Sequence, residues 1–125
     1  MKASLSSLHH QLTDWLRETD FYKQEISVLE KRLGEVASKN TALEVTSLVE
    51  HFQNKFILTK EQLDILAHDL KKEETGVEEK VTLLPEHINE KFVQVDDKTN
   101  ERMKIFASGF ADLRFEFNTF LSKVI

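Results

Sequence analysis

LSSLHHQLTDWLRETDFYKQEISVLEKRLGEV, residues 5–36, is the stretch of sequence that decides the fold. Apolar side chains recur in it at alternating spacings of three and four, and the residues between them are mostly polar or charged. A repeat that averages 3.5 residues places these side chains along one side of a helix. The series is Leu5, Leu8, Leu12, Trp15, Thr19, Tyr22, Ile26, Leu29, Leu33, Val36 and Asn40. We therefore predict one helix over residues 4–38, about 50 Å long.

A second apolar stripe follows a short polar break at residues 39–41. Asn40 tolerates the left-handed conformation that often closes a helix, and Thr41 with Glu44 forms a capping-box pattern for the next one. The stripe predicts a second helix over residues 42–74, and an alternative is a break near Leu58, where the following polar residues resemble a helix start. Its members are Val45, Leu48, Phe52, Phe56, Thr59, Leu63, Leu66 and Leu70.

A third stripe occupies the last third of the chain. Gly76 lies in an acidic segment and suits a helix end, while Pro85 suits the first turn of a new helix. The pattern predicts a third helix over residues 85–123. Its apolar series is Ile88, Phe92, Val95, Thr99, Met103, Phe106, Phe110, Leu113, Phe117, Phe120 and Val124.

The three stripes predict an all-α fold. A single helix cannot bury its stripe alone, and most helical stability in proteins comes from packing. Short connections make consecutive helices antiparallel. We expect residues 1–125 to form one domain, an antiparallel up-down-up three-helix bundle with long coiled-coil-like helices.

Composition narrows the classes of function. The chain has 17 basic and 22 acidic residues, a net charge of -5 and no cysteine. The charges are interspersed, whereas nucleic-acid and membrane-surface binders gather positive charge on one face, so we expect neither partner. No stretch approaches the length of a membrane-spanning helix, and the first residues do not read as a secretory signal. We expect a cytoplasmic protein, because absence of cysteine fits a reducing compartment.

The sequence contains no motif of a known catalytic class. It has no glycine-rich phosphate loop, no G-x-S-x-G and no H-E-x-x-H. We therefore predict that the chain is not an enzyme and has no cofactor. Metal binding is the alternative, because His10 with Asp14, and Asp64 with His68, lie one helical turn apart. These residues are off the apolar stripes, so we expect solvent-exposed side chains and no metal site.

The C-terminal end is the predicted partner surface. Five of the nine phenylalanines fall within the last twenty residues. The expected positions of the turns leave this end overhanging the bundle, so a protein partner or a second copy would bind Phe115, Phe120, Leu121 and Val124. The alternative is that the end folds over the turn at residues 40–43 and becomes core. The function we predict is a non-enzymatic interaction or scaffold bundle, with a metal- or small-molecule-binding bundle as the alternative.

Small and polar residues interrupt the stripes. Thr19, Thr59 and Thr99 are expected at one level of the bundle, as a polar layer that fixes the register of the helices or, alternatively, as a ligand pocket. Gly109 marks either a close approach of two helices or a position that faces solvent.

Two segments resemble an uncharacterised family of small bacterial helical proteins. They are LHHQLTDWLRETDFYKQEISVLEKRL, residues 8–33, and VEHFQNKFILTKEQLDILAHDL, residues 49–70, which together make up less than half of the chain. The resemblance implies a helical bundle. It implies no activity and no site.

Overall fold

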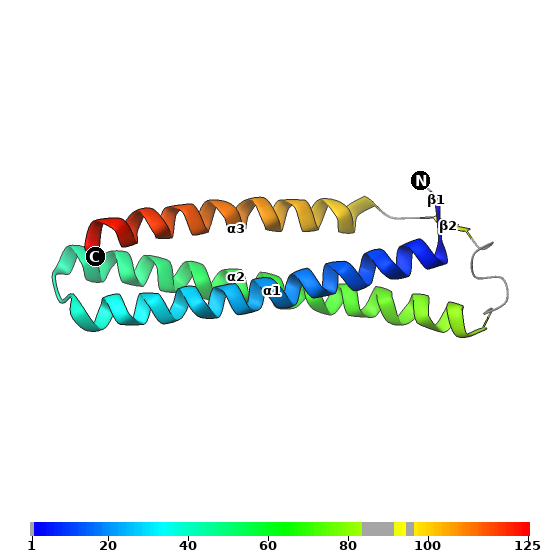
Figure 1. The fold of residues 1–125 in the computed structure, drawn as a ribbon, viewed down its shortest axis with the longest axis horizontal. Helices are drawn as coiled ribbons and strands as arrows, with labels where there is room; N and C mark the ends of the chain where they lie inside the picture. The colour runs from blue at the N-terminus through cyan, green and yellow to red at the C-terminus, as the bar shows by residue number, and fades with distance from the viewer. Residues whose placement is uncertain (1, 84–91, 95–96) are drawn as a thin grey trace.

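Three long helices make up most of the molecule, and they lie along one common axis (Figure 1). The computed structural model describes residues 2–83, 92–94 and 97–125, with side chains for residues 4–80 and 97–125. The helices are α1 (Leu5–Lys39), α2 (Leu43–Leu83) and α3 (Asp97–Val124). Two strands, β1 (Lys2–Ser4) and β2 (Phe92–Gln94), add a short antiparallel ladder at one end. The predicted three-helix, all-α architecture is confirmed.

The ends of α1 fall within one residue of the prediction. Ser4 caps the helix by accepting a hydrogen bond from the Ser7 backbone N–H at 3.1 Å, which satisfies one of the free donors of the first turn. At the other end, the Asn40 backbone N–H and Nδ2 both donate to the Val36 carbonyl oxygen. Asn40 is extended, with φ -129° and ψ 115°, so the left-handed conformation expected there is wrong.

Helix α2 is longer than predicted. It is continuous through Leu58, so the alternative of a break there is wrong, and it runs through Gly76 to Leu83 instead of ending near residue 74. Val77, which follows Gly76, is buried among apolar residues of α1 and α3. Glycine costs a helix about 1 kcal/mol relative to alanine, and burial of a valine offsets a cost of this size.

Helix α3 begins later than predicted. The structure starts it at Asp97, whereas the third stripe predicted a start at Pro85. Phe92–Gln94 is strand β2 and pairs with β1 in the register Lys2 to Gln94, Ala3 to Val93 and Ser4 to Phe92. The hydrogen bonds of this ladder give backbone N–H and C=O groups of residues 92–94 the partners that a helix would otherwise supply. The remaining predicted helical residues, 85–91 and 95–96, lie outside the described part of the chain.

Side-chain pairs fix the directions of the helices. As the residue number increases along α1, the number of the facing residue on α2 decreases, so α1 and α2 are antiparallel. The same holds for α2 and α3. Helix α3 rises together with α1, which completes the up-down-up order. The pairs are Lys23–Asp64 and Glu30–Lys60 for α1 and α2, Phe56–Phe117 and Asp69–Arg102 for α2 and α3, and Tyr22–Phe106 and Glu25–Arg114 for α1 and α3.

The core consists largely of the predicted stripes, but Leu48 of the second stripe is 45% exposed, and Val77 and Leu121 are buried although no stripe contained them. Near the turn between α1 and α2, four phenylalanine rings from α2 and α3 pack with centroids 5.1–6.3 Å apart. All of these pairs are edge-on or tilted, as aromatic rings prefer. A second cluster around Leu5, Leu12, Leu70 and Met103 fills the other end. The rings of the first cluster are those of Phe52, Phe56, Phe117 and Phe120. No helix in the described part of the chain is both long and apolar enough to cross a membrane.

Two phenylalanines of α3 test this assignment of the core. Phe117 is 0% exposed and Phe115 is 74% exposed. Phe117→Ala leaves a cavity, so we expect it to lower the free energy of unfolding by about 3–5 kcal/mol. Phe115→Ala, the matched control, should change it by less than about 0.5 kcal/mol. Urea denaturation followed by circular dichroism measures both, and equal losses would contradict the core described here.

Candidate functional site

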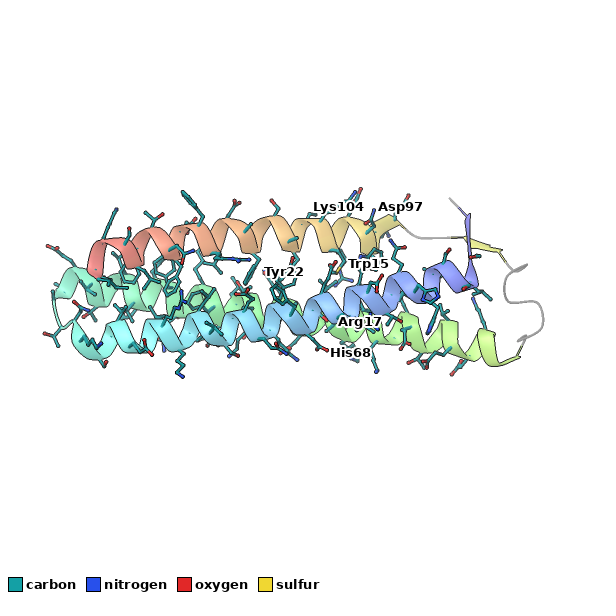
Figure 2. The ribbon with its side chains drawn as sticks, viewed as in Figure 1. Trp15, Arg17, Tyr22, His68, Asp97 and Lys104 are labelled. Atoms are coloured by element: carbon teal, nitrogen blue, oxygen red, sulfur yellow. The ribbon has the colours of Figure 1, made fainter. Side chains whose placement is uncertain are left out.

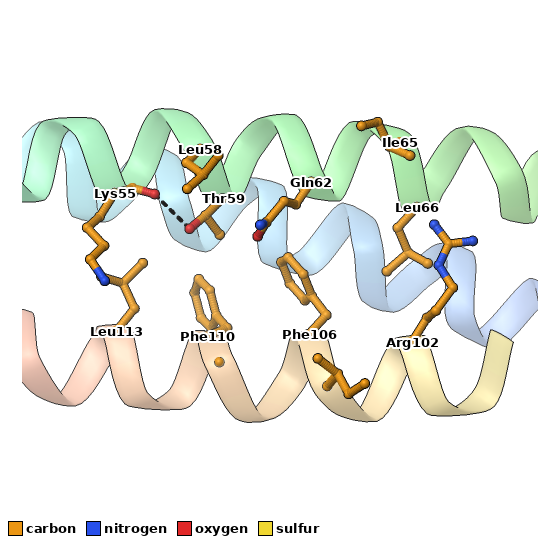
Figure 3. Close-up of a pocket in the computed structure, with 12 residues that line it drawn as sticks. Lys55, Leu58, Thr59, Gln62, Ile65, Leu66, Arg102, Phe106, Phe110 and Leu113 are labelled. Carbon is orange, nitrogen blue, oxygen red and sulfur yellow. Dashed lines mark hydrogen bonds between the residues drawn. The ribbon is translucent and has the colours of Figure 1, made fainter. Parts of the chain in front are cut away.

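A groove lies on the surface of the described chain between α2 and α3 (Figure 3). Its volume is about 520 Å³. Phe106 and Phe110 of α3 point toward α2 and form its floor together with Leu66, while Lys55 and Arg102 stand at its two ends. Three apolar side chains along the groove are exposed: Leu58 and Ile65 on α2, and Ile105 on α3.

The groove exists because α3 lies farther from α2 than α1 does. Helices α1 and α2 pack closely, and the buried apolar residues of α1 are all Leu, Ile or Val. The interface of α3 is built instead from large rings such as Phe106, Phe110 and Phe117, which separate the backbones. Below this surface the rings fill the space, so the groove is shallow and open along its length.

Polar groups at the ends of the groove have partners within the chain. The Arg102 guanidinium lies 2.9 Å from an Asp69 carboxylate oxygen. The Thr59 hydroxyl donates to the Lys55 carbonyl oxygen at 2.7 Å. The charged residues of the lining are confined to the two ends, and between them the lining is apolar except for Thr59 and Gln62.

Gly109 lies in the wall of the groove. A side chain at this position would meet nothing within 4 Å. Gly109 therefore faces solvent and does not mark a close approach of two helices. The absence of a side chain leaves a gap in the α3 surface one turn after Ile105.

This gap gives a stability test. Gly109→Ala and Gly34→Ala both replace a helical glycine with open space around it. We expect each to raise the free energy of unfolding by about 1 kcal/mol, because alanine has the higher helix propensity. Thermal denaturation at low protein concentration measures the change. If Gly109→Ala lowered the free energy of unfolding while Gly34→Ala raised it, other residues of the same chain would have to occupy the space beside position 109.

Tyr22 of α1 packs behind the groove, between α1 and α3 (Figure 2). Its ring lies against Phe106 and Phe110, at centroid distances of 5.1 and 4.9 Å. Burial raises the pKa of the Tyr22 hydroxyl above 10.0, nearby Glu18 raises the pKa further, and Arg114 lowers it in part. The folded chain thus holds this proton more tightly than the unfolded chain does.

The raised pKa of Tyr22 makes stability depend on pH in the alkaline range. Below about pH 10 both states keep the proton and stability is complete; above it the unfolded state loses the proton first, so stability falls as pH rises. Tyr22 is the only tyrosine, so phenolate absorbance follows it directly. We expect a midpoint above 10, and a smaller alkaline loss of stability in Tyr22→Phe than in the wild type. A midpoint at or below 10 would contradict this environment.

The predicted partner residues at the C-terminal end are divided by the structure. Phe115 is exposed, but Phe120 and Leu121 are buried in the core and Val124 packs against it. The predicted overhang of Phe120 and Leu121 is therefore wrong, because this end of α3 folds against the ends of α1 and α2. A recess of about 420 Å³ remains beside Leu121 and Val124, and charged residues of α1 line much of it.

The four residues considered for metal binding are not brought together. Asp14 pairs with Arg17 at 3.7 Å and Asp64 pairs with Lys23 at 3.2 Å. His10 and His68 are exposed, and Figure 2 shows His68 on the side away from α3. Within the described residues, no three histidine or carboxylate side chains gather closely enough to hold a metal ion.

A contact between a partly exposed histidine and a largely buried carboxylate was missed by the sequence reasoning. His9 Nδ1 lies 3.9 Å from Glu74 Oε1, and the Glu74 side chain is 12% exposed. Glu74 stands at the predicted end of the second helix, whereas α2 continues past it to Leu83 and places Glu74 beside His9 of α1. One histidine and one carboxylate are fewer ligands than a structural zinc site requires.

The three threonines do not form the predicted polar layer. Thr99 donates to Glu73 Oε1 at 2.9 Å, Thr19 donates to the Leu16 carbonyl oxygen, and Thr59 bonds within its own turn of α2. Because α2 is longer and α3 begins later than predicted, facing positions on these helices shift by several residues. Each hydroxyl is satisfied where it lies, so the ligand pocket considered at that layer has no basis.

The chain was compared with known proteins. No family model, no curated protein and no solved structure matches it. The resemblance of residues 8–33 and 49–70 to a bacterial helical family therefore stays a prediction.

The exposed apolar residues of the groove were also missed. Leu58, Ile65 and Ile105 are off the three stripes, and the sequence reasoning gave them no role. The available signal was their spacing, because Leu58 and Ile65 are seven residues apart and so share one face of α2.

Proposed function

We propose that this protein is a non-enzymatic interaction module whose α2/α3 groove receives an apolar helix from a protein partner. The observation that carries the proposal is the row of exposed apolar side chains along the groove, with Ile65 60% exposed and Ile105 71% exposed. Several exposed apolar side chains gathered along one groove mark a binding site more often than an isolated exposed leucine does.

The shape of the groove favours a helix as its occupant. Two nearly parallel walls, α2 and α3, run along it, and the apolar residues on each wall recur at about one or two turns of helix. An amphipathic helix presents side chains at the same spacing and fits such a groove through alternate turns. The charges at its ends, Lys55 and Arg102, would contact polar residues on the rim of that helix.

The charged residues and the composition of the chain also support a non-enzymatic role and a cytoplasmic location. A bundle whose described charged residues lie mostly in ion pairs or on the surface offers no arranged group for acid–base chemistry, which supports a binding role. A cysteine-free chain is typical of a reducing compartment, so we propose the cytoplasm.

Site-specific photo-crosslinking in the native cells tests the proposal. A photoreactive amino acid in place of Ile105 should give a discrete protein adduct, because the partner helix would lie directly over this position. The same amino acid in place of Lys31, an exposed position on α1, is the control and should give none.

A second substitution separates docking from chance collision. Ile65→Glu places a charge on the opposite wall of the groove at an exposed position, so the fold should be kept while the adduct from position 105 is lost. The absence of any adduct at 105, or equal adducts at 105 and 31, would show that the groove is not a binding surface.

A further inference from the structure

Helix α3 carries a second heptad series, on the edge that faces the groove. Lys98, Arg102, Ile105, Gly109, Asp112 and Glu116 follow one another at alternating steps of four and three, as the core stripe does. Arg102, Ile105 and Gly109 line the groove, and Lys98, Asp112 and Glu116 are exposed on the same edge. Positions at this spacing share one face of a helix, so the series is a continuous surface.

The charges of this series are opposite in its two halves. Lys98 and Arg102 are basic, Asp112 and Glu116 are acidic, and Ile105 and Gly109 lie between them. When a helix of this pattern meets a copy of itself in antiparallel orientation, each basic residue faces an acidic one. A two-fold interface requires this type of self-complementarity, because residue i then contacts j while j contacts i.

We propose that the occupant of the groove is α3 of a second copy of this chain, antiparallel to the first, with the two-fold axis near Ala107. This inference rests on the proposed function of the groove. In this register Lys98 faces Glu116 of the second copy, and Arg102 faces Asp112 of the second copy. Ile105 faces Gly109 of the second copy and fills the gap that the missing side chain leaves.

The surroundings of the axis suit this arrangement. Asp69 of α2 is opposite Arg102, so Ile65, one turn earlier on α2, lies at the level of Phe106 and next to the axis. Its exposed side chain would cover the arriving helix from the side. Arg102 would then lie between Asp69 of its own chain and Asp112 of the second copy, where its five N–H donors can serve both carboxylates.

Charge reversal tests the register in the purified full chain. We expect the wild type to have twice the monomer mass by sedimentation at low ionic strength. Lys98→Glu and Glu116→Lys each turn two opposite-charge pairs of the dimer into like-charge pairs, so each should raise the dimer dissociation constant by about tenfold or more. Lys104→Glu, the same change at an exposed position on the other edge of α3, should leave it nearly unchanged.

Mixing the two weakened variants gives the sharpest test. In a mixed dimer, each reversed residue faces a residue of opposite charge, so equimolar Lys98→Glu and Glu116→Lys chains should associate about as tightly as the wild type. The double variant in one chain should do the same. Restoration of this kind depends on residues 98 and 116 facing each other, whereas loss of folding could not produce it.

The outcomes separate this inference from the proposed function. A wild type that is monomeric at all concentrations, or a mixture that stays as weak as its components, overturns the second copy as the occupant. If the purified chain is monomeric while the photoreactive group at position 105 captures another protein in cells, the groove still functions in binding and the inference alone is wrong. If the group at 105 captures nothing in cells and the chain is monomeric, both are wrong.

Discussion

Helix α3 rests on α1 and α2 through phenylalanine rings, and the width of these rings governs the shape of the molecule. The buried apolar side chains of α1 are aliphatic and α1 packs closely on α2, whereas α3 contributes the rings of Phe106, Phe110, Phe117 and Phe120, which hold it farther away. Each helix must cover its apolar stripe, and the three described helices leave the groove at the edge of the α2/α3 interface uncovered. The interactions that close the core thus also create the surface at which a partner would bind.

Local periodicity allowed most of the helical structure to be predicted. The series from Leu5 to Val36 gave α1 to within one residue at each end, because every position in it repeats the same signal. The prediction was wrong where distant contacts override local preference. Gly76 did not end α2, because Val77 is buried against other helices, and Phe92 joined a strand whose partner is some ninety residues away in sequence.

The site was harder to predict than the fold, for a geometric reason. Which residues of α2 and α3 face each other depends on where one helix ends and the next begins, and the sequence pattern misplaced both points. Phe120 and Leu121 were therefore expected beyond the end of the bundle, although they lie in its core. Leu58, Ile65 and Ile105 share a groove only in the correct pairing, and no short segment of the sequence contains that pairing.

The ladder between β1 and β2 has a consequence for how α3 can vary. Ser4 leads directly into α1 and β2 lies just ahead of α3, so the start of α3 is anchored to the start of α1, while its far end is anchored by buried rings. Between these anchors the helix has a fixed phase. A single inserted residue would rotate everything beyond it by about 100° and advance it by about 1.5 Å. The fold of the single chain therefore tolerates substitutions on the exposed edge of α3 far more readily than any change in the length of this helix.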